Sequence, residues 1–366
     1  MTTHKVFFQN SSKMSNLKEG SVDLVVTSPP YPMIEMWDEI MASQNPEIGA
    51  ALKNNPQFAF ELMHLELDKV WNECYRLLKD GGFMCINIGD ATRTIGGEFQ
   101  LYNNHSRIVK HCIELGMVNL PNIIWRKQTN APNKFMGSGM LPCGAYVTLE
   151  HEWILIFRKN GKRIYKKEIE KEERRRSAFF WEERNIWFSD IWDLKGVKQK
   201  ISNSATRERS AAYPIEIPYR LINMYSQQND TVLDPFLGLG TTSIAAMIAE
   251  RNSIGLEIDT MLTTSIKENI STLSLNDMNK YIYTRFKKHN EFITNRINDG
   301  KDVKYYNDIL SCKVMTRQEI EMSLNYLQSL KLSTDLNNLS FECLYTENTD
   351  MEKDLSLGEL FDYQIR

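Results

Sequence analysis

Residues 231–242 have the sequence TVLDPFLGLGTT, and this stretch decides the fold. Its first three residues form a short apolar strand, a loop containing Gly238 and Gly240 follows, and an apolar helical stretch begins at Thr241 and runs to residue 250. A strand, a glycine-rich turn and a helix N-terminus make a nucleotide-binding unit, because glycines let the backbone approach a ligand closely. The segment predicts an α/β fold with a cofactor at the carboxyl ends of the strands.

The acidic residues around this loop indicate which cofactor it binds. Glu257 follows Asp234 by 23 residues, at the end of the next apolar strand, where a carboxylate suits a ribose diol. Ser243 replaces the third glycine of the dinucleotide fingerprint, and Asp234 would repel a pyrophosphate. A cationic sulfonium with an amino-acid tail fits better, so the sequence favours S-adenosylmethionine, with a nicotinamide dinucleotide as the alternative.

A second motif, TSPPY at residues 27–31, follows the apolar strand at residues 21–26. The exocyclic amine of a base is a poor nucleophile, because its lone pair is delocalised into the ring. The Ser28 hydroxyl and the rigidly held Pro29 carbonyl can accept its N–H bonds, and the Tyr31 ring can stack on a base taken out of the duplex. We interpret the motif as a base-flipping pocket; the alternative is a simple turn after a strand.

Together the two motifs resemble those of the adenine-N6 and cytosine-N4 DNA methyltransferases. Over about residues 1–275, the catalytic motif precedes the cofactor motif, which is the order of the β group of that family. The resemblance implies a Rossmann-like methyltransferase fold of the α/β class, circularly permuted, with a mixed seven-stranded sheet and helices on both faces. It also implies S-adenosylmethionine as the cofactor and duplex DNA as the partner.

The resemblance carries over to individual residues. It assigns a catalytic role to Ser28, Pro29, Pro30 and Tyr31. It assigns cofactor contacts to Asn10, Thr27, Asp234, Pro235, Phe236, Gly238, Gly240, Thr241, Thr242 and Glu257. Asn10 stands where the family usually has aspartate, and residues 212–218 match a wall of the methionine pocket. Asp90 is a candidate for the cofactor side or for capping a helix.

Serine at position 28 indicates cytosine N4 as the target atom within this family, since most adenine enzymes have aspartate there. The expected biology is the modification enzyme of a prokaryotic restriction-modification system, whose cognate endonuclease acts on the same sites. Adenine N6 is the nearest alternative. A non-catalytic DNA-binding protein on the same fold, or a methylase acting on RNA or a small molecule, are the others.

Two further sequence features look catalytic and are expected not to be. Pro142-Cys143 resembles the Pro-Cys of carbon-5 cytosine methyltransferases, but those enzymes place their cofactor motif first. His151-Glu152 lacks the second histidine of a zinc-peptidase helix and lies in a strand-like run, so no metal is expected.

The net charge of −3 favours a localised basic cleft over a chain that coats nucleic acid. Between residues 158 and 176 there are ten lysines and arginines against four glutamates. This segment occupies the place of the target-recognition region in β-group enzymes, and the alternative is an exposed helix of mixed charge. The expected DNA-binding residues are Lys166, Lys167, Arg174, Arg175, Arg176, Lys198 and Lys200. A loop at residues 130–145 is expected near the catalytic crevice. The aromatic residues Trp181, Trp187, Phe188 and Trp192 are expected to pack in the core, with bracing of the DNA face as the alternative.

The motifs divide the chain into four parts. Residues 1–157 form the catalytic half with a helical insert at 32–64, residues 158–212 the basic insert, and residues 213–275 the cofactor-binding half. Residues 276–366 form an extension with a predicted helix over 317–330, expected to help read the target, make a homodimer contact or hold a partner. No apolar signal region follows Met1, no eighteen apolar residues run together, and the six cysteines form no Cys-x-x-Cys pair. A cytoplasmic protein of a prokaryote, acting at the nucleoid and not at a membrane, is expected.

Overall fold

The computed structural model describes residues 1–127, 136–196, 213–335 and 338–347. The main sheet contains β1 (Thr2–Phe8), β2 (Val22–Thr27), β3 (Leu78–Ile88), β6 (Met117–Asn119), β7 (Ile123–Arg126), β10 (His151–Lys159), β11 (Ile191–Asp193), β12 (Thr231–Asp234), β13 (Asn252–Glu257), β16 (Asn325–Asp335) and β17 (Asn338–Glu347). Three small hairpins are formed by β4 (Ala91–Ile95) with β5 (Glu98–Tyr102), β8 (Met136–Gly137) with β9 (Ala145–Tyr146), and β14 (Tyr305–Asn307) with β15 (Cys312–Val314).

The helices are α1 (Asp38–Gln44), α2 (Glu47–Asn54), α3 (Pro56–Leu77), α4 (Asn104–Glu114), α5 (Glu168–Arg176), α6 (Trp181–Trp187), α7 (Glu216–Tyr225), α8 (Thr241–Ile248), α9 (Thr263–Ser271) and α10 (Leu275–Asn298). Short 3-10 turns are η1 (Glu35–Trp37), η2 (Thr260–Leu262) and η3 (Arg317–Glu319). Among the described helices none is long and apolar enough to cross a membrane.

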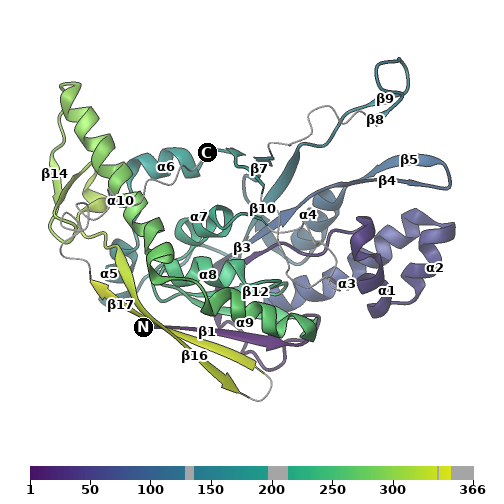
Figure 1. Ribbon diagram of the computed structural model, residues 1–366, viewed down its shortest axis with the longest axis horizontal. Helices are drawn as coiled ribbons and strands as arrows, with labels where there is room; N and C mark the ends of the chain where they lie inside the picture. The colour runs from purple at the N-terminus through teal and green to yellow at the C-terminus, as the bar shows by residue number, and fades with distance from the viewer. Residues whose placement is uncertain (128–135, 197–212, 336–337, 348–366) are drawn as a thin grey trace.

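The sheet is parallel at its centre and antiparallel at its flanks. Its strand order is β11-β7-β10-β3-β2-β12-β13-β1-β17-β16, with β6 paired to β10. The run from β3 to β1 is parallel, while β10 is antiparallel to β3 and β17 is antiparallel to β1. Figure 1 shows this sheet crossing the molecule, with the loops at the carboxyl ends of its parallel strands next to α1 and α9. A parallel sheet places ligand sites at that end.

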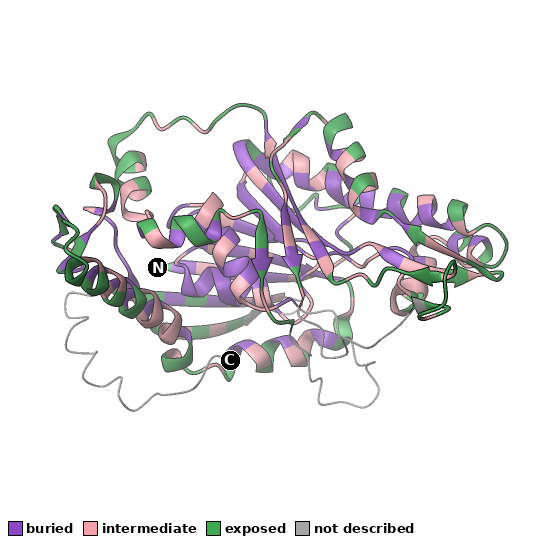
Figure 2. Cartoon of the chain, turned by 90° about the horizontal axis from the view of Figure 1, so that it is seen from above, coloured by how far each residue is buried: buried purple, intermediate pink, exposed green. Residues whose placement is uncertain are grey.

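Helices cover both faces of the sheet, as the resemblance implies. Alternate residues of β2 point to opposite faces, so Leu24 and Val26 join one core cluster and Val25 joins the other. The first cluster is closed by α7, α8 and α10, and the second by α3 and α4. Figure 2 shows the central strands buried between these two layers. Strands buried on both faces need continuous apolar runs, which explains why β2 and β3 are so apolar in sequence.

The two motifs meet because β2 and β12 are neighbours in the sheet. Leu24 pairs with Val232 and Val25 with Leu233, although about two hundred residues separate them along the chain. The catalytic loop after β2 and the cofactor loop after β12 therefore leave the same edge side by side. The strand carrying the catalytic motif comes first in the chain, in agreement with the permuted order.

The expected count of seven strands is too low for this sheet. The run from β7 to β1 supplies seven, and β6, β11, β16 and β17 bring the described sheet to eleven. The helix predicted over residues 317–330 is wrong, because η3 and the first half of β16 occupy this stretch. β17 pairs with β1 and buries Phe341 and Leu339, so the extension covers a sheet edge that would otherwise be open.

The two inserts differ in how they join the sheet. The helical prediction for residues 32–64 is confirmed by η1, α1, α2 and the start of α3. The described part of the basic insert contributes α5, α6 and β11, and β11 pairs with β7 in the main sheet. Core packing is confirmed for Trp187 and Trp192, which are buried, whereas Trp181 and Phe188 are each 38% exposed.

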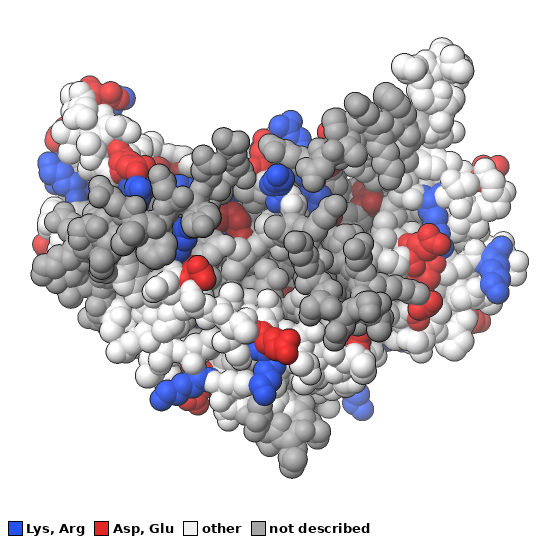
Figure 3. Space-filling view, viewed as in Figure 1, with Lys and Arg blue, Asp and Glu red and all other residues white. Residues whose placement is uncertain are grey.

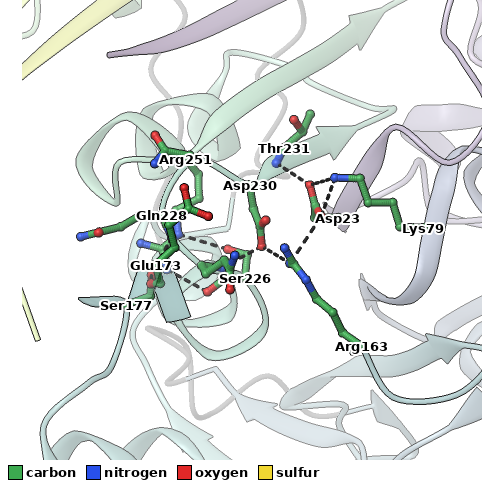
Figure 4. Close-up of polar contacts among 12 residues, drawn as sticks. Asp23, Lys79, Arg163, Glu173, Ser177, Ser226, Gln228, Asp230, Thr231 and Arg251 are labelled. Atoms are coloured by element: carbon green, nitrogen blue, oxygen red, sulfur yellow. Dashed lines mark hydrogen bonds and ion pairs between the residues drawn. The ribbon is translucent and has the colours of Figure 1, made fainter. Parts of the chain in front are cut away.

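The basic insert begins at the amino ends of the parallel strands, as Figure 4 shows. Arg163 Nη1 lies 2.7 Å from the Asp230 carboxylate before β12 and 3.4 Å from Asp23 on β2. Lys79 on β3 donates to Asp23 at 2.8 Å. Burial and the Asp23 charge raise the pKa of Asp230 to about 6, while Arg163 opposes the rise. This ion-pair cluster fixes the start of the insert to the edge opposite the cofactor loop.

Candidate active site

The buried Asp234 side chain connects the catalytic motif to the cofactor motif through hydrogen bonds. Thr27 donates to one of its carboxylate oxygens and Thr242 to the other, each at 2.6 Å, and the Phe236 amide donates at 3.0 Å. Asp234 is only 3% exposed; burial raises its pKa, and these hydrogen bonds lower it. With both oxygens engaged, Asp234 braces the catalytic loop against the cofactor loop.

A cavity lies in front of this brace, with about 1170 Å³ of empty space when its open mouth is included. Of the expected cofactor residues, Asn10, Pro235, Phe236, Gly238, Thr241 and Glu257 line it. The structure places Thr27, Asp234, Gly240 and Thr242 outside its lining, in the supporting layer. Ser28, Pro29 and Pro30 also line the cavity, so the catalytic loop and the cofactor loop share one space.

Hydrogen bonds to acidic and polar side chains shape the cofactor loop. Glu257 accepts from the Gly238 amide and from the Asp259 amide, each at 2.9 Å, and Ser11 donates to the Pro235 carbonyl at 2.5 Å. Gly240 caps α8 with φ of 88°, where a Cβ atom would also lie 3.2 Å from the Ile270 side chain. Glycine is therefore needed at this turn for backbone and packing reasons.

The predicted pocket wall at residues 212–218 falls partly within the described chain. Tyr213 lines the cavity and lies 2.5 Å from the Thr242 hydroxyl. The helical insert and α3 form another part of the cavity wall, which the sequence motifs did not predict. These lining residues are Trp37, Ile40, Met41, Gln44, Glu66, Leu67 and Val70. The apolar residues of α1 could have indicated a buried face, but nothing in their spacing indicates a cavity.

The charges of the wall select the kind of ligand that fits. The described lining includes the carboxylates of Glu66 and Glu257 and contains neither lysine nor arginine. Phe236, Leu256 and Ile258 add apolar surface suited to a flat ring. Glu66 is ion-paired with Lys69, which lies outside the lining, so Glu257 is the lining carboxylate that favours a positively charged nucleoside over a diphosphate. The cavity therefore fits S-adenosylmethionine better than a dinucleotide.

The catalytic end contains a connected set of four polar side chains. Tyr31 Oη lies 3.1 Å from Ser28 Oγ and donates to Glu152 Oε2 at 2.8 Å. Asn87 Nδ2 lies 2.7 Å from Glu152 Oε2, 2.8 Å from Tyr31 Oη and 3.4 Å from Ser28 Oγ. Burial, followed by the Glu152 charge, raises the pKa of Tyr31 well above its usual value, so its phenol stays protonated.

Asn87 and Glu152 were not expected to take part. Both are buried, with 2% and 9% exposure, and Lys127 forms an ion pair with the other Glu152 oxygen. A signal was present in the sequence, because each is a polar residue within an otherwise apolar strand, Asn87 near the end of β3 and Glu152 at the start of β10. These strands are antiparallel neighbours, with Asn87 paired to Ile154, so both side chains reach the catalytic edge.

Asp90 and Cys143 have other places in the structure. Asp90 accepts from the His105 amide at 3.1 Å in the first turn of α4 and from the His105 ring at 2.6 Å, which is the helix-capping alternative. Cys143 is exposed, lies between β8 and β9, and does not line the cavity. The loop expected at residues 130–145 is described only from residue 136 onward, where it forms this hairpin; there Tyr146 stacks on Phe99 of β5 at 4.6 Å.

The basic residues of α5 do not lie beside the cavity. The segment before α5 forms ion pairs with Asp23 and Asp230 at the amino ends of the strands, and α5 lies on the opposite side of Figure 1 from α1. Arg175 forms ion pairs with Glu168 at 3.2 Å and Glu321 at 2.7 Å. Lys166, Lys167 and Arg174 are exposed, Arg176 is half-buried, and Lys198 and Lys200 lie outside the described residues. On the face in Figure 3, basic and acidic side chains of the described chain are intermingled.

Comparisons with known proteins bear on the family of this chain. A family model described as DNA methylase matches residues 22–268. The Type II methyltransferase M.MthZI of Methanothermobacter thermautotrophicus is 51% identical over 94% of this chain and 96% of its own. M.MjaI of Methanocaldococcus jannaschii, also a Type II methyltransferase, is 49% identical over 74% of this chain and 91% of its own. A putative DNA modification methylase of Thermus thermophilus, solved with S-adenosyl-L-methionine, superposes with a TM-score of 0.57 at 31% identity, covering 73% of this chain and 95% of that one.

Proposed function

The chain belongs to the N6/N4 DNA methylase family and is an S-adenosylmethionine-dependent DNA methyltransferase, and we propose that its target atom is N4 of cytosine within a short sequence of duplex DNA. The observation that carries the proposal is the serine at position 28, on the wall of the cavity and next to the Tyr31 hydroxyl. Aspartate is the usual residue at this place in adenine enzymes of the family.

Ser28 and Pro29 hold the amine of the target base. The amine nitrogen must become pyramidal before its lone pair can attack, and acceptors placed at its N–H bonds favour that geometry. The Ser28 hydroxyl oxygen is one acceptor and the Pro29 carbonyl oxygen is the other. We propose that the Tyr31 ring, which adjoins Ser28 and is not among the residues lining the cavity, stacks on the flipped base, a contact worth about 1–3 kcal/mol for an unpaired base.

S-adenosylmethionine supplies an electrophilic methyl group when it is bound. Phe236, Glu257 and Asn10 would hold its nucleoside end, while Glu66 and Tyr213 would lie toward its cationic end. Transfer between two sites of one cavity needs no covalent bond to the protein. We therefore propose no role for Cys143, whose position outside the lining supports that view.

The Type II relatives support a restriction-modification role, in which methylation protects the host sites from a cognate endonuclease. Methylation of adenine N6 is the second candidate, and it is favoured by the general range of the family and by no particular residue here. A protein that binds DNA without modifying it is disfavoured by the intact Ser28, Tyr31 and Glu257.

Expression in a bacterium that lacks its own methylases, followed by sequencing that distinguishes modified bases, tests the proposal. N4-methylcytosine within one short motif is the expected result. N6-methyladenine at such a motif would keep the fold and the cofactor but refute the assignment of Ser28 to cytosine. Unmodified DNA in cells that contain the folded protein would favour the binding-protein and RNA alternatives.

A further inference from the structure

Hydrogen-bond directions at the catalytic end follow from counting protons. Glu152 carries no proton to give when it is ionised, so Tyr31 Oη, 2.8 Å away, must donate to it. Tyr31 has a single hydroxyl proton, and its oxygen can therefore only accept from Ser28, 3.1 Å away. The Ser28 proton thus points at Tyr31 and away from the substrate. The serine lone pairs remain for an incoming N–H.

Asn87 does not compete for those lone pairs. Its amide nitrogen must face Glu152 Oε2 at 2.7 Å, because its carbonyl oxygen would be repelled by the carboxylate. The two amide protons then have three acceptors, at 2.7, 2.8 and 3.4 Å, and the two shorter contacts to Glu152 and Tyr31 take them. Ser28, at the longest distance, keeps its acceptor capacity for the amine.

From these directions we infer that Glu152 is a positioning residue and the terminal proton acceptor of the reaction, acting on the target amine through Tyr31 and Ser28. The inference rests on the proposed role of Ser28. As the N–CH₃ bond forms and the C–S bond of the donor breaks, one amine N–H bond breaks. Its proton passes to Ser28 Oγ, the Ser28 proton passes to Tyr31 Oη, and the Tyr31 proton passes to Glu152 Oε2. The positive charge of the donor and the negative charge of Glu152 disappear together, and Lys127 is left beside a neutral carboxylic acid.

The surroundings of Glu152 suit this role. Lys127 occupies the other oxygen, Oε1, which keeps Oε2 directed at the relay. The raised pKa of Tyr31 keeps its hydroxyl protonated before the reaction, which is the state the relay requires. A Glu152 side chain that only formed an ion pair with Lys127 would not need Tyr31 and Asn87 to donate to its second oxygen, Oε2.

Single-turnover methylation by Glu152→Gln tests the inference, because the amide oxygen of glutamine still accepts from Tyr31 but takes no proton. The rate constant of methyl transfer is expected to fall about 100-fold or more, with the KM for S-adenosylmethionine and the Kd for DNA within about threefold of the parent values. Asp68→Asn is the matched control. Asp68 on α3 is a buried carboxylate that forms an ion pair with Arg107 on α4 and has no contact with the relay. Asp68→Asn should therefore methylate DNA at the parent rate.

Tyr31→Phe keeps the ring and removes the middle of the relay. It should lose as much rate as Glu152→Gln, and the double variant should be no slower than either single variant, since all three interrupt one path. A transfer rate for Glu152→Gln within about threefold of the parent overturns the inference. If Glu152→Gln fails to fold, a normal rate for Tyr31→Phe overturns it equally. A fully active Ser28→Ala would instead refute the proposed role of Ser28 on which the relay rests.

Discussion

Ser28 is the residue on which the proposed chemistry depends most. Its half-buried side chain contacts Tyr31 and the cavity, and it supports no core packing. Ser28→Ala should lower the rate of methyl transfer about 100-fold or more through loss of the acceptor, while the Kd for S-adenosylmethionine stays within about twofold. Single-turnover kinetics with calorimetric cofactor binding would check this. Near-normal turnover with intact cofactor binding would remove Ser28 from the mechanism.

Glu257 should control affinity for the cofactor and leave the chemical step alone. Its carboxylate orders the loop through the Gly238 amide and lines the cavity. Glu257→Gln retains one acceptor and loses the charge, so the Kd for S-adenosylmethionine should rise by about tenfold or more, which corresponds to about 1.4 kcal/mol. Titration calorimetry measures this directly. An unchanged Kd would place the ribose elsewhere in the cavity.

Residues with a distinctive neighbourhood in the sequence were identified from it, and residues without one were missed. Ser28 and Glu257 stand at strand ends beside prolines and glycines, where polar residues indicate a site. Asn87 and Glu152 belong to apolar strands, and only the antiparallel pairing of β3 with β10 brings them to Tyr31. The expected cofactor contact of Asp234 stays a prediction, and its hydrogen bond to Thr27 could not be predicted, because Thr27 lies on another strand 207 residues away.

Helix α5 is the element whose role is most open to experiment. The DNA contacts proposed for Arg174, Arg175 and Arg176 require a duplex that reaches the edge of the sheet opposite the cavity. Changing all three to alanine should then weaken DNA binding and flatten its salt dependence, and leave the transfer rate at saturating DNA unchanged. The affinity for DNA, measured at several salt concentrations for the parent and the variant, shows whether α5 contacts the duplex. An unchanged salt slope would move the DNA surface to the carboxyl end of the sheet.

The hairpin of β16 and β17 should be part of the fold and not an appendage. Phe341 is fully buried and its backbone pairs with His4 of β1, so Phe341→Ala should cost about 3–5 kcal/mol of unfolding free energy. Leu344, on the same strand, is 38% exposed, and Leu344→Ala should cost much less. Urea unfolding of the two variants gives the comparison. Equal costs below about 1 kcal/mol would show that the hairpin does not share the core.

Elements with one dominant pattern were predicted well. The apolar strands β2, β3, β12 and β13 and the helix α8 could be placed from their runs and flanking glycines. Residues 317–330 misled the prediction because apolar residues spaced for a helix face also satisfy a twisted, partly covered strand, and pairing with β17 decides between the two. The strand that pairs with this segment is not part of it, so the sequence pattern within residues 317–330 cannot indicate the pairing.

For the whole molecule, buried histidines should set the response of stability to acid. Burial lowers the pKa of His64 to about 3, against an unfolded value near 6.5. The unfolded chain therefore binds this proton first as pH falls below 6.5, and the folded state loses about 1.4 kcal/mol per pH unit until pH approaches the folded value. Between pH 7 and pH 5 the free energy of unfolding of His64→Gln should therefore fall by about 2 kcal/mol less than that of the parent protein.

Urea unfolding at both pH values checks this prediction. His4, whose pKa burial also lowers to about 3, should give a second and additive effect through His4→Gln. Identical pH dependence in the parent and in both variants would mean that other groups govern acid stability.

The overall architecture could be predicted because two short motifs fix the order and direction of the central strands. Three features could not be predicted, because each depends on contacts between segments distant in sequence. They are the eleven strands of the described sheet, the part of the cavity wall formed by α1, and the position of α5 at the opposite edge of the sheet. The identity of the modified base rests on Ser28 alone.

Incubation of the purified protein with duplex DNA and methyl-labelled S-adenosylmethionine, followed by digestion to nucleosides and mass spectrometry, tests the central claim most directly. The expected result is label in N4-methyldeoxycytidine and none in any other nucleoside. Label in N6-methyldeoxyadenosine, or in 5-methyldeoxycytidine with its dependence on Cys143, would contradict it.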